Sequence, residues 1–187
     1  MKHPYNLSSK SRSALAKHAG AVLLSYRVNL PDDSSLETFV LRFEDEDVEI
    51  HTKEISGTDD WFDETNTVEV ESRPERDSVS PLGESVPYDG IPAGTFRVCP
   101  VNRTITGMFA AVCRTVCKGK TAEEGEFVRA IILCFGDDAI VFDKGEPEWG
   151  YNWQITHCRF GEIKFADSDD KTEWLEFQTE TRIERIA

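Results

Sequence analysis

The sequence has little histidine and methionine, and it lacks the compact motifs that identify common enzyme families. Only four histidines and two methionines occur in 187 residues. There is no glycine-rich phosphate loop, no pair of histidines at helical zinc spacing, no Cys-x-x-Cys pair and no nucleophile elbow. These absences disfavour the enzyme classes that carry such motifs, although they do not exclude an enzyme. We therefore predict no cofactor and favour a protein without catalytic activity.

Long apolar runs are also missing. No stretch approaches the ~18–20 apolar residues that a membrane-spanning helix needs, so we predict no membrane segment. The basic N-terminus is followed by an apolar run at residues 19–25, which is short and late for a signal peptide. The five cysteines are too few, and odd in number, for the disulfide framework of a small secreted domain. The sequence thus predicts a cytoplasmic protein with buried thiols.

Charge is strongly one-sided, with a formal net charge of −14. Residues 31–91 hold most of the excess, with 19 acidic and four basic side chains. So acidic a chain repels phosphate backbones, which disfavours nucleic-acid binding. It attracts basic proteins and speeds encounter with them, so a basic protein partner is predicted. The alternative is that the charge serves solubility alone.

What the chain does have is aromatic residues and short alternating segments, which predict a mainly β fold. It contains 11 Phe, four Trp and four Tyr, enough for a sizeable core. A helix is expected at residues 8–18, capped by Ser8 or Ser9 and stopped by Gly20. Strands are expected at residues 21–30, 36–43, 47–55, 67–71, 95–101, 104–116, 127–135, 139–142, 151–158, 162–165 and 174–177.

The spacing of these strands favours an antiparallel sandwich or a partly closed barrel with one short N-terminal helix. Residues 1–20 form a basic arm or helix, and residues 21–187 form a single domain. A long loop is expected at about residues 73–92, which hold four prolines. Residues 127–135 form the most continuous apolar run of the chain and indicate a central strand buried on both faces. Residues 108–117 suit either a strand or a helix, and residues 180–186 either a last strand or a short helix.

An aromatic strip is the first candidate binding surface. On a strand, Trp149, Tyr151 and Trp153 would share one face, which Ile155 and His157 would continue. Trp and Tyr dominate binding hot spots, so the strip could contact a partner or, if exposed, favour a homodimer. The alternative is that these side chains belong to a core strand, because each buries a large area.

An acidic segment is the second candidate surface. Residues 59–64 combine carboxylates with aromatic side chains, and the candidate partner-binding residues are Asp59, Asp60, Trp61, Asp63 and Glu64. The same carboxylates could form a divalent-metal site of an enzyme. We predict no resident metal.

The cysteines provide two weaker hypotheses. Cys113 and Cys117, with the downstream His157 and Cys158, are ligands of the kind zinc prefers. Cys134 or Cys158 could act as a nucleophile with a histidine base. However, neighbouring residues of a strand point to opposite faces, so His157 does not readily serve Cys158.

These observations leave three hypotheses of function. The leading one is a non-catalytic interaction protein that binds a basic macromolecule, in the manner of an inhibitor or immunity-type protein. The second is a small-ligand-binding β-barrel, with an interior lined by Phe127, Ile131, Trp153 and Phe165. The third is a metal-dependent enzyme with a carboxylate site.

Overall fold

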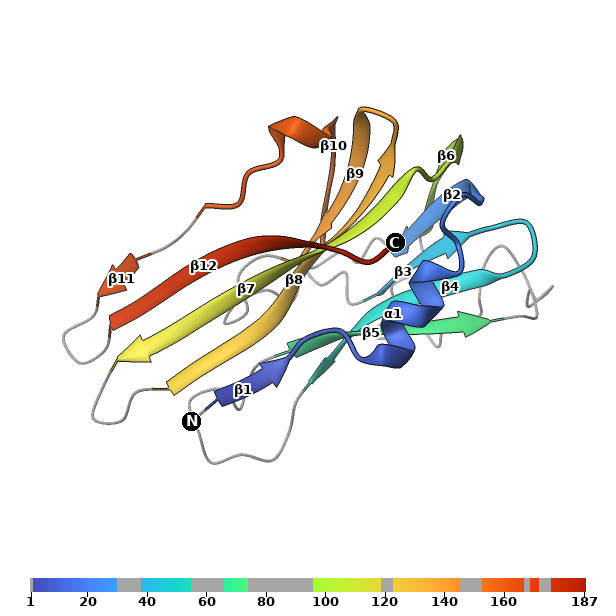
Figure 1. Ribbon diagram of the computed structural model, residues 1–187. Coiled ribbons are helices and arrows are strands. Elements are labelled where there is room, and N and C mark those ends of the chain that lie inside the picture. The colour runs from blue at the N-terminus through green and yellow to red at the C-terminus, as the bar shows by residue number, and fades with distance from the viewer. Residues whose placement is uncertain are drawn as a thin grey trace, which may run out of the picture.

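The computed structural model describes residues 2–29, 38–54, 66–73, 96–118, 123–144, 153–166, 169–171 and 176–187. Within these ranges the chain forms one short helix, one turn of 3-10 helix and twelve strands (Figure 1). The elements are β1 (Lys2–Tyr5), α1 (Ser9–Ala16), β2 (Val22–Asn29), β3 (Thr38–Arg42), β4 (Asp47–Glu54), β5 (Asn66–Arg73), β6 (Phe96–Thr104), β7 (Gly107–Lys118), β8 (Glu123–Phe135), β9 (Asp138–Asp143), β10 (Gln154–Arg159), η1 (Phe160–Glu162), β11 (Asp169–Lys171) and β12 (Glu176–Arg185).

The strands form two sheets, which confirms the predicted mainly β fold. The large sheet has the order β10-β9-β8-β7-β12-β11, and β1 pairs with β8 in parallel; the small sheet has the order β5-β4-β3-β2-β6. Every other pairing is antiparallel. The described strands do not close into a barrel, so the sandwich of the two predicted alternatives is the one observed. Within the described residues, no helix is long and apolar enough to cross a membrane.

Aromatic side chains from both sheets join the inner faces into one core. Phe39 of the small sheet stacks on Phe142 of the large sheet, with ring centroids 4.2 Å apart and planes within 4°. Trp153 meets Phe39 edge-on, with centroids 4.9 Å apart. On β4, Val48 and Ile50 are fully buried, which confirms the predicted period-two alternation. Of the residues predicted to line a ligand-binding interior, Ile131 and Trp153 are buried in the core between the sheets. Phe127 is buried but not part of that core, and Phe165 packs on the outer face of the large sheet.

Strand β8 is buried on both faces, as predicted. Leu133 packs in the core between the sheets, while Ile132 belongs to a second apolar cluster on the outer face of the large sheet. Phe160, Ile163 and Phe165 pack against that outer cluster. The segment after β10 thus covers the back of the large sheet.

Helix α1 matches the prediction closely. Ser8 is the N-cap and its hydroxyl accepts a hydrogen bond from the amide of Ser11. Gly20 has φ = +82°, a left-handed conformation that favours glycine at the end of a helix. Leu15 is buried in the core, and Arg12 pairs with Glu184 of β12 at 2.7 Å. The N-terminal segment is therefore packed onto the domain through α1, and β1 is a strand that the sequence did not predict.

Two local predictions were wrong. The segment expected to form a strand at residues 162–165 is instead the end of η1 followed by irregular chain. Its apolar side chains pack on the outer cluster, but its backbone pairs with no described strand. The turn expected at residues 102–103 lies within β6, and the chain turns at residues 105–106. Strand β11 was also not foreseen. Most of the expected 73–92 loop lies outside the described residues.

The core accounts for most of the stability, so truncating its central ring is expected to be costly. Phe39→Ala should lower the free energy of unfolding by ~3–5 kcal/mol, the range usual for removing a buried aromatic ring. Urea denaturation followed by circular dichroism measures this loss. Val98→Ala is the matched control, because Val98 is 57% exposed and should change stability by less than ~0.5 kcal/mol. Equal losses in the two variants would contradict the described core.

Candidate functional site

Most of the predicted partner-binding residues lie outside the described residues: Asp59, Asp60, Trp61, Asp63, Glu64, Trp149 and Tyr151. The exception is Trp153, which is only 2% exposed and packs on Phe39. Ile155 and His157 follow it on the same inner side of β10, as predicted. Trp153 therefore contributes to the core and not to a surface strip, which removes one of the three side chains on which the predicted homodimer rested.

The cysteine hypotheses gain no support from the geometry. His157 bonds to Tyr26 on the inner side of the large sheet, whereas Cys158 packs in the outer cluster. Burial raises the pKa of the Cys158 thiol, and nearby Glu162 raises it further, which disfavours the nucleophilic thiolate. No group of three or more His, Cys, Asp or Glu side chains that could hold a metal occurs among the described residues.

Cys134 and Cys158 lie in one cross-strand row, with Ala139 between them. Two strand spacings separate their Cα atoms by roughly 9–10 Å. A disulfide needs a Cα separation below ~7 Å, so these thiols cannot be joined without backbone movement. Burial raises the pKa of Cys134 to about 11, and the neighbouring Cys158 contributes to this rise. This pair is therefore a part of the apolar cluster and not a reactive site.

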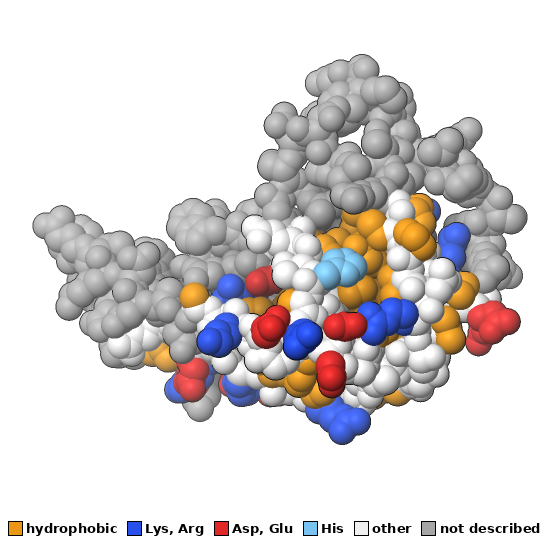
Figure 2. Space-filling model, turned by 90° about the horizontal axis from the view of Figure 1, so that it is seen from above, with side chains coloured by type: hydrophobic (Ala, Val, Ile, Leu, Met, Phe, Trp, Pro, Cys, Tyr) orange, Lys and Arg blue, Asp and Glu red, His pale blue; other side chains and the backbone are white. Residues whose placement is uncertain are grey.

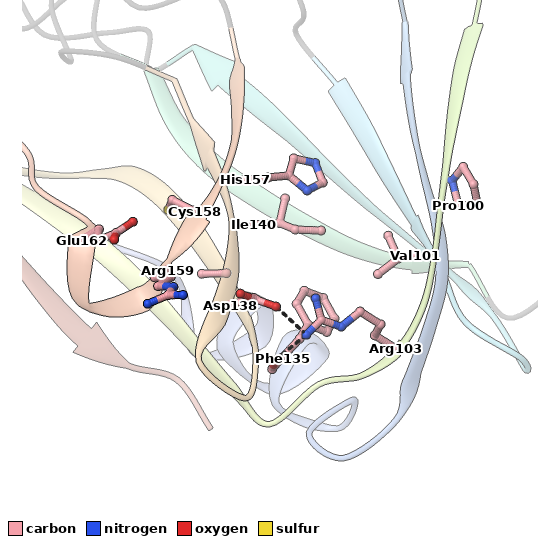
Figure 3. Close-up of a pocket in the computed structure, with 11 residues that line it drawn as sticks. Pro100, Val101, Arg103, Phe135, Asp138, Ile140, His157, Cys158, Arg159 and Glu162 are labelled. Carbon is pink, nitrogen blue, oxygen red and sulfur yellow. Dashed lines mark hydrogen bonds and ion pairs between the residues drawn. The ribbon is translucent and has the colours of Figure 1, made fainter.

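A concave site of the described residues lies on the open side of the sandwich, where the edge strand β6 faces β9 and the edge strand β10 (Figure 3). It is an open cleft of about 490 Å³. Apolar side chains on its surface are Pro100, Val101, Phe135, Ala139 and Ile140, and polar ones are Arg103, Asp138, His157, Cys158, Arg159 and Glu162. Five apolar and six polar side chains thus share the lining, and convergent polar groups of this kind orient ligands in small-molecule sites.

Arg103 crosses one end of this cleft from β6 to the β8–β9 turn, as Figure 3 shows. Its Nη2 donates to the carbonyl oxygen of Phe135 at 2.7 Å and to Oδ2 of Asp138 at 2.9 Å. The guanidinium carbon also lies 5.2 Å from the centre of the Phe135 ring. These contacts fix the arginine side chain at the cleft surface.

A second polar contact connects the sheets nearby. The Oη of Tyr26 on β2 lies 2.9 Å from Nε2 of His157 on β10. Tyr26 is buried, whereas His157 is exposed and lines the cleft. The face seen from above carries hydrophobic side chains next to charged side chains of both signs (Figure 2). The cleft is thus bordered by polar contacts that connect the two sheets.

A separate groove of about 400 Å³ lies on the large sheet where the inner face changes from apolar to charged. On β7, the side chain of Val112 faces the core, and Arg114, two residues further along the strand, points to the same side. The groove is lined by Arg114, Glu124, Glu126, Glu180 and Arg182. It therefore contains three carboxylates and two guanidinium groups.

Both guanidinium groups of the groove are engaged. Arg114 donates from Nε to Glu124 at 2.7 Å, and Arg182 makes two bonds with Glu126, at 2.8 and 3.2 Å. The hydrogen bond to Glu124 raises the pKa of Arg114, and the charge of Glu180 adds to this rise. Glu180 lies opposite Arg114 in the ladder and is exposed. Glu180 makes no hydrogen bond or ion pair to another described residue. The groove consequently has a surplus carboxylate at its surface.

Of the residues that line the two sites, the sequence had singled out His157 and Cys158 of the cleft and none of the groove. Arg103 and Asp138 were expected in the breaks between strands, and no interpretation was given for the charged residues of β7, β8 and β12. Only the strand register brings Arg114, Glu126 and Arg182 together, because they are distant in the chain. No family model, no curated protein and no solved structure matches this chain.

Lys144 is the most unusual titratable group that the structure describes. It follows β9, is fully buried, and its amide donates to the carbonyl of Arg129 at 3.0 Å. Burial lowers its pKa to about 8, and the charges of Cys113 and Asp143 oppose this shift only in part. Because the charged form is disfavoured in the folded state, this lysine makes stability depend on pH.

A pH series of unfolding experiments tests this description of Lys144. The pKa of Lys144 is lower in the folded state than its value of 10.5 in the unfolded chain, so above pH 10.5 the buried amine is neutral in both states and does not reduce stability. As the pH falls from 10.5 to about 8, the free energy of unfolding decreases. Relative to Lys144→Met, the free energy of unfolding of the wild-type protein should rise by on the order of 3 kcal/mol as the pH is raised from about 8 to 10.5. Urea denaturation of both proteins across this range measures the difference. A difference that does not change with pH would contradict a desolvated amine.

Proposed function

We propose that this chain is a non-catalytic interaction domain that binds a basic segment of a partner protein. The observation that carries the proposal is the groove of the large sheet, where Glu180 is the surplus carboxylate. A lysine or arginine side chain entering the groove would find Glu180 exposed, with Glu124 and Glu126 in the same lining. Charge-assisted hydrogen bonds to such a cation are about twice as strong as neutral ones.

The charge of the whole chain supports the same partner class. A net charge of −14 attracts a basic protein over a distance and raises the rate of encounter at low salt. A second copy of this chain carries the same negative charge, so it is a poorer occupant of the groove. The acidic segment at residues 59–64 stays a further proposed contact for the same partner.

A cytoplasmic location also stays part of the proposal. Cys99, Cys113, Cys134 and Cys158 are all free thiols. Free thiols persist in a reducing compartment, where disulfides are rare. A basic cytoplasmic protein is therefore the partner class that we expect.

Fluorescence anisotropy with a labelled deca-arginine peptide tests the groove directly. The wild-type protein should bind the peptide at low salt, and added salt should weaken the binding. Glu180→Gln should weaken binding by roughly two- to fivefold, the effect usual for one exposed charge.

The matched control is Glu71→Gln on β5, which changes the net charge by the same amount. Glu71 lies on the outer face of the small sheet, opposite Glu49 and away from the inward-facing Val70. Glu71→Gln should leave peptide binding unchanged. Equal weakening by both variants would show that only the overall charge attracts the peptide, and the groove would then not be the binding site.

A further inference from the structure

We infer that the cleft between β6 and β10 is a binding site for a small organic carboxylate, with Arg103 as the residue that holds the carboxylate group. This site shares no lining residue with the groove proposed for the basic partner. It therefore goes beyond the proposed function, and either proposal can fail without the other.

Arg103 is preorganised to bind a planar anion. Both of its hydrogen bonds use Nη2, so Nε and Nη1 have no hydrogen-bond partner among the described residues. Contact with the Phe135 ring restrains the guanidinium further. An arginine held in this way binds an anion without losing much side-chain freedom, and Nε or Nη1 can donate a charge-assisted hydrogen bond to one carboxylate oxygen.

The rest of the cleft surface indicates the body of the ligand. Val101, Phe135 and Ile140 provide apolar surface on both sides of the opening. A volume of about 490 Å³ lies within the ~300–1,000 Å³ of typical small-molecule pockets. The chemistry that fits is an acid with an apolar or aromatic body.

The charges of the cleft favour a singly charged anion. Arg103 and Arg159 supply two positive charges, and Asp138 and Glu162 supply two negative ones. Arg159 makes no ion pair with another described residue and adds positive charge on the β10 side. A monoanionic carboxylate can approach Arg103, whereas a doubly charged phosphate would be repelled more strongly by the two carboxylates.

Amide chemical shifts of the isotope-labelled protein, titrated with phenylacetate, test the inference. Phenylacetate should bind with roughly millimolar affinity, as expected for a ligand of its size, and should shift the amides of Ala139 and Ile140. The neutral analogue phenylacetamide should bind at least about tenfold more weakly, because it lacks the charge-assisted bonds. Phenyl phosphate should also bind more weakly.

Arg103→Gln should weaken phenylacetate binding by about tenfold. The protein should remain folded, because the Arg103 and Asp138 side chains are 46% and 56% exposed and such pairs add little stability. Arg42→Gln is the matched control, since Arg42 is exposed to nearly the same extent, at 45%, and forms an ion pair with Asp47 on the small sheet; it should leave binding unchanged.

Asp138→Asn supplies an independent variant with the opposite expected sign. It removes the carboxylate that shares Arg103, so phenylacetate should bind a few-fold more tightly. The inference is overturned if phenylacetate does not bind, if phenylacetamide or phenyl phosphate binds equally well, or if Arg103→Gln binds like the wild-type protein. Weaker binding to Asp138→Asn would also overturn it.

Discussion

The face-to-face packing of two sheets through aromatic rings is the interaction on which this structure depends. The stack of Phe39 on Phe142 joins β3 of the small sheet to β9 of the large sheet. Burying such rings removes a large apolar area from water and fixes the distance between the sheets. Trp153 adds to the same contact, so an aromatic side chain that looked available for binding is used for folding. Binding surfaces must then lie where this core ends.

A bulge in β8 determines where the core ends on the large sheet. Ala111 pairs with Ala130 but Val112 pairs with Val128, so Arg129 is an extra residue in the ladder. Before the bulge, the even-numbered residues of β8 face inward, and they include Glu124 and Glu126 of the groove. After it, the odd-numbered residues face inward and are apolar. The same strand thus supplies a charged groove at one end and the packed core at the other.

The fold was largely predictable from the sequence, whereas the sites were not. Alternation in residues such as Val48 and Ile50 identified most strands, and Ser8 and Gly20 identified the helix, because these signals are local. Register and sheet order are not local. The contact of Arg103 with Asp138 and the grouping of Arg114 with Glu180 arise only when distant strands pair. Irregular chain near residues 162–165 was misassigned because apolar side chains serve a packed loop as well as a strand.

Hydrogen–deuterium exchange measured for individual amides tests the central claim, a two-sheet sandwich whose open side is bordered by β6 and β10. The account predicts the slowest exchange in β8, which has strand neighbours on both sides and is buried on both faces. Exchange in β6 and β10 should be faster at those amides that point away from β2 and β9. Protection of these outward amides as strong as that in β8 would mean that the side is closed, and it would contradict the account.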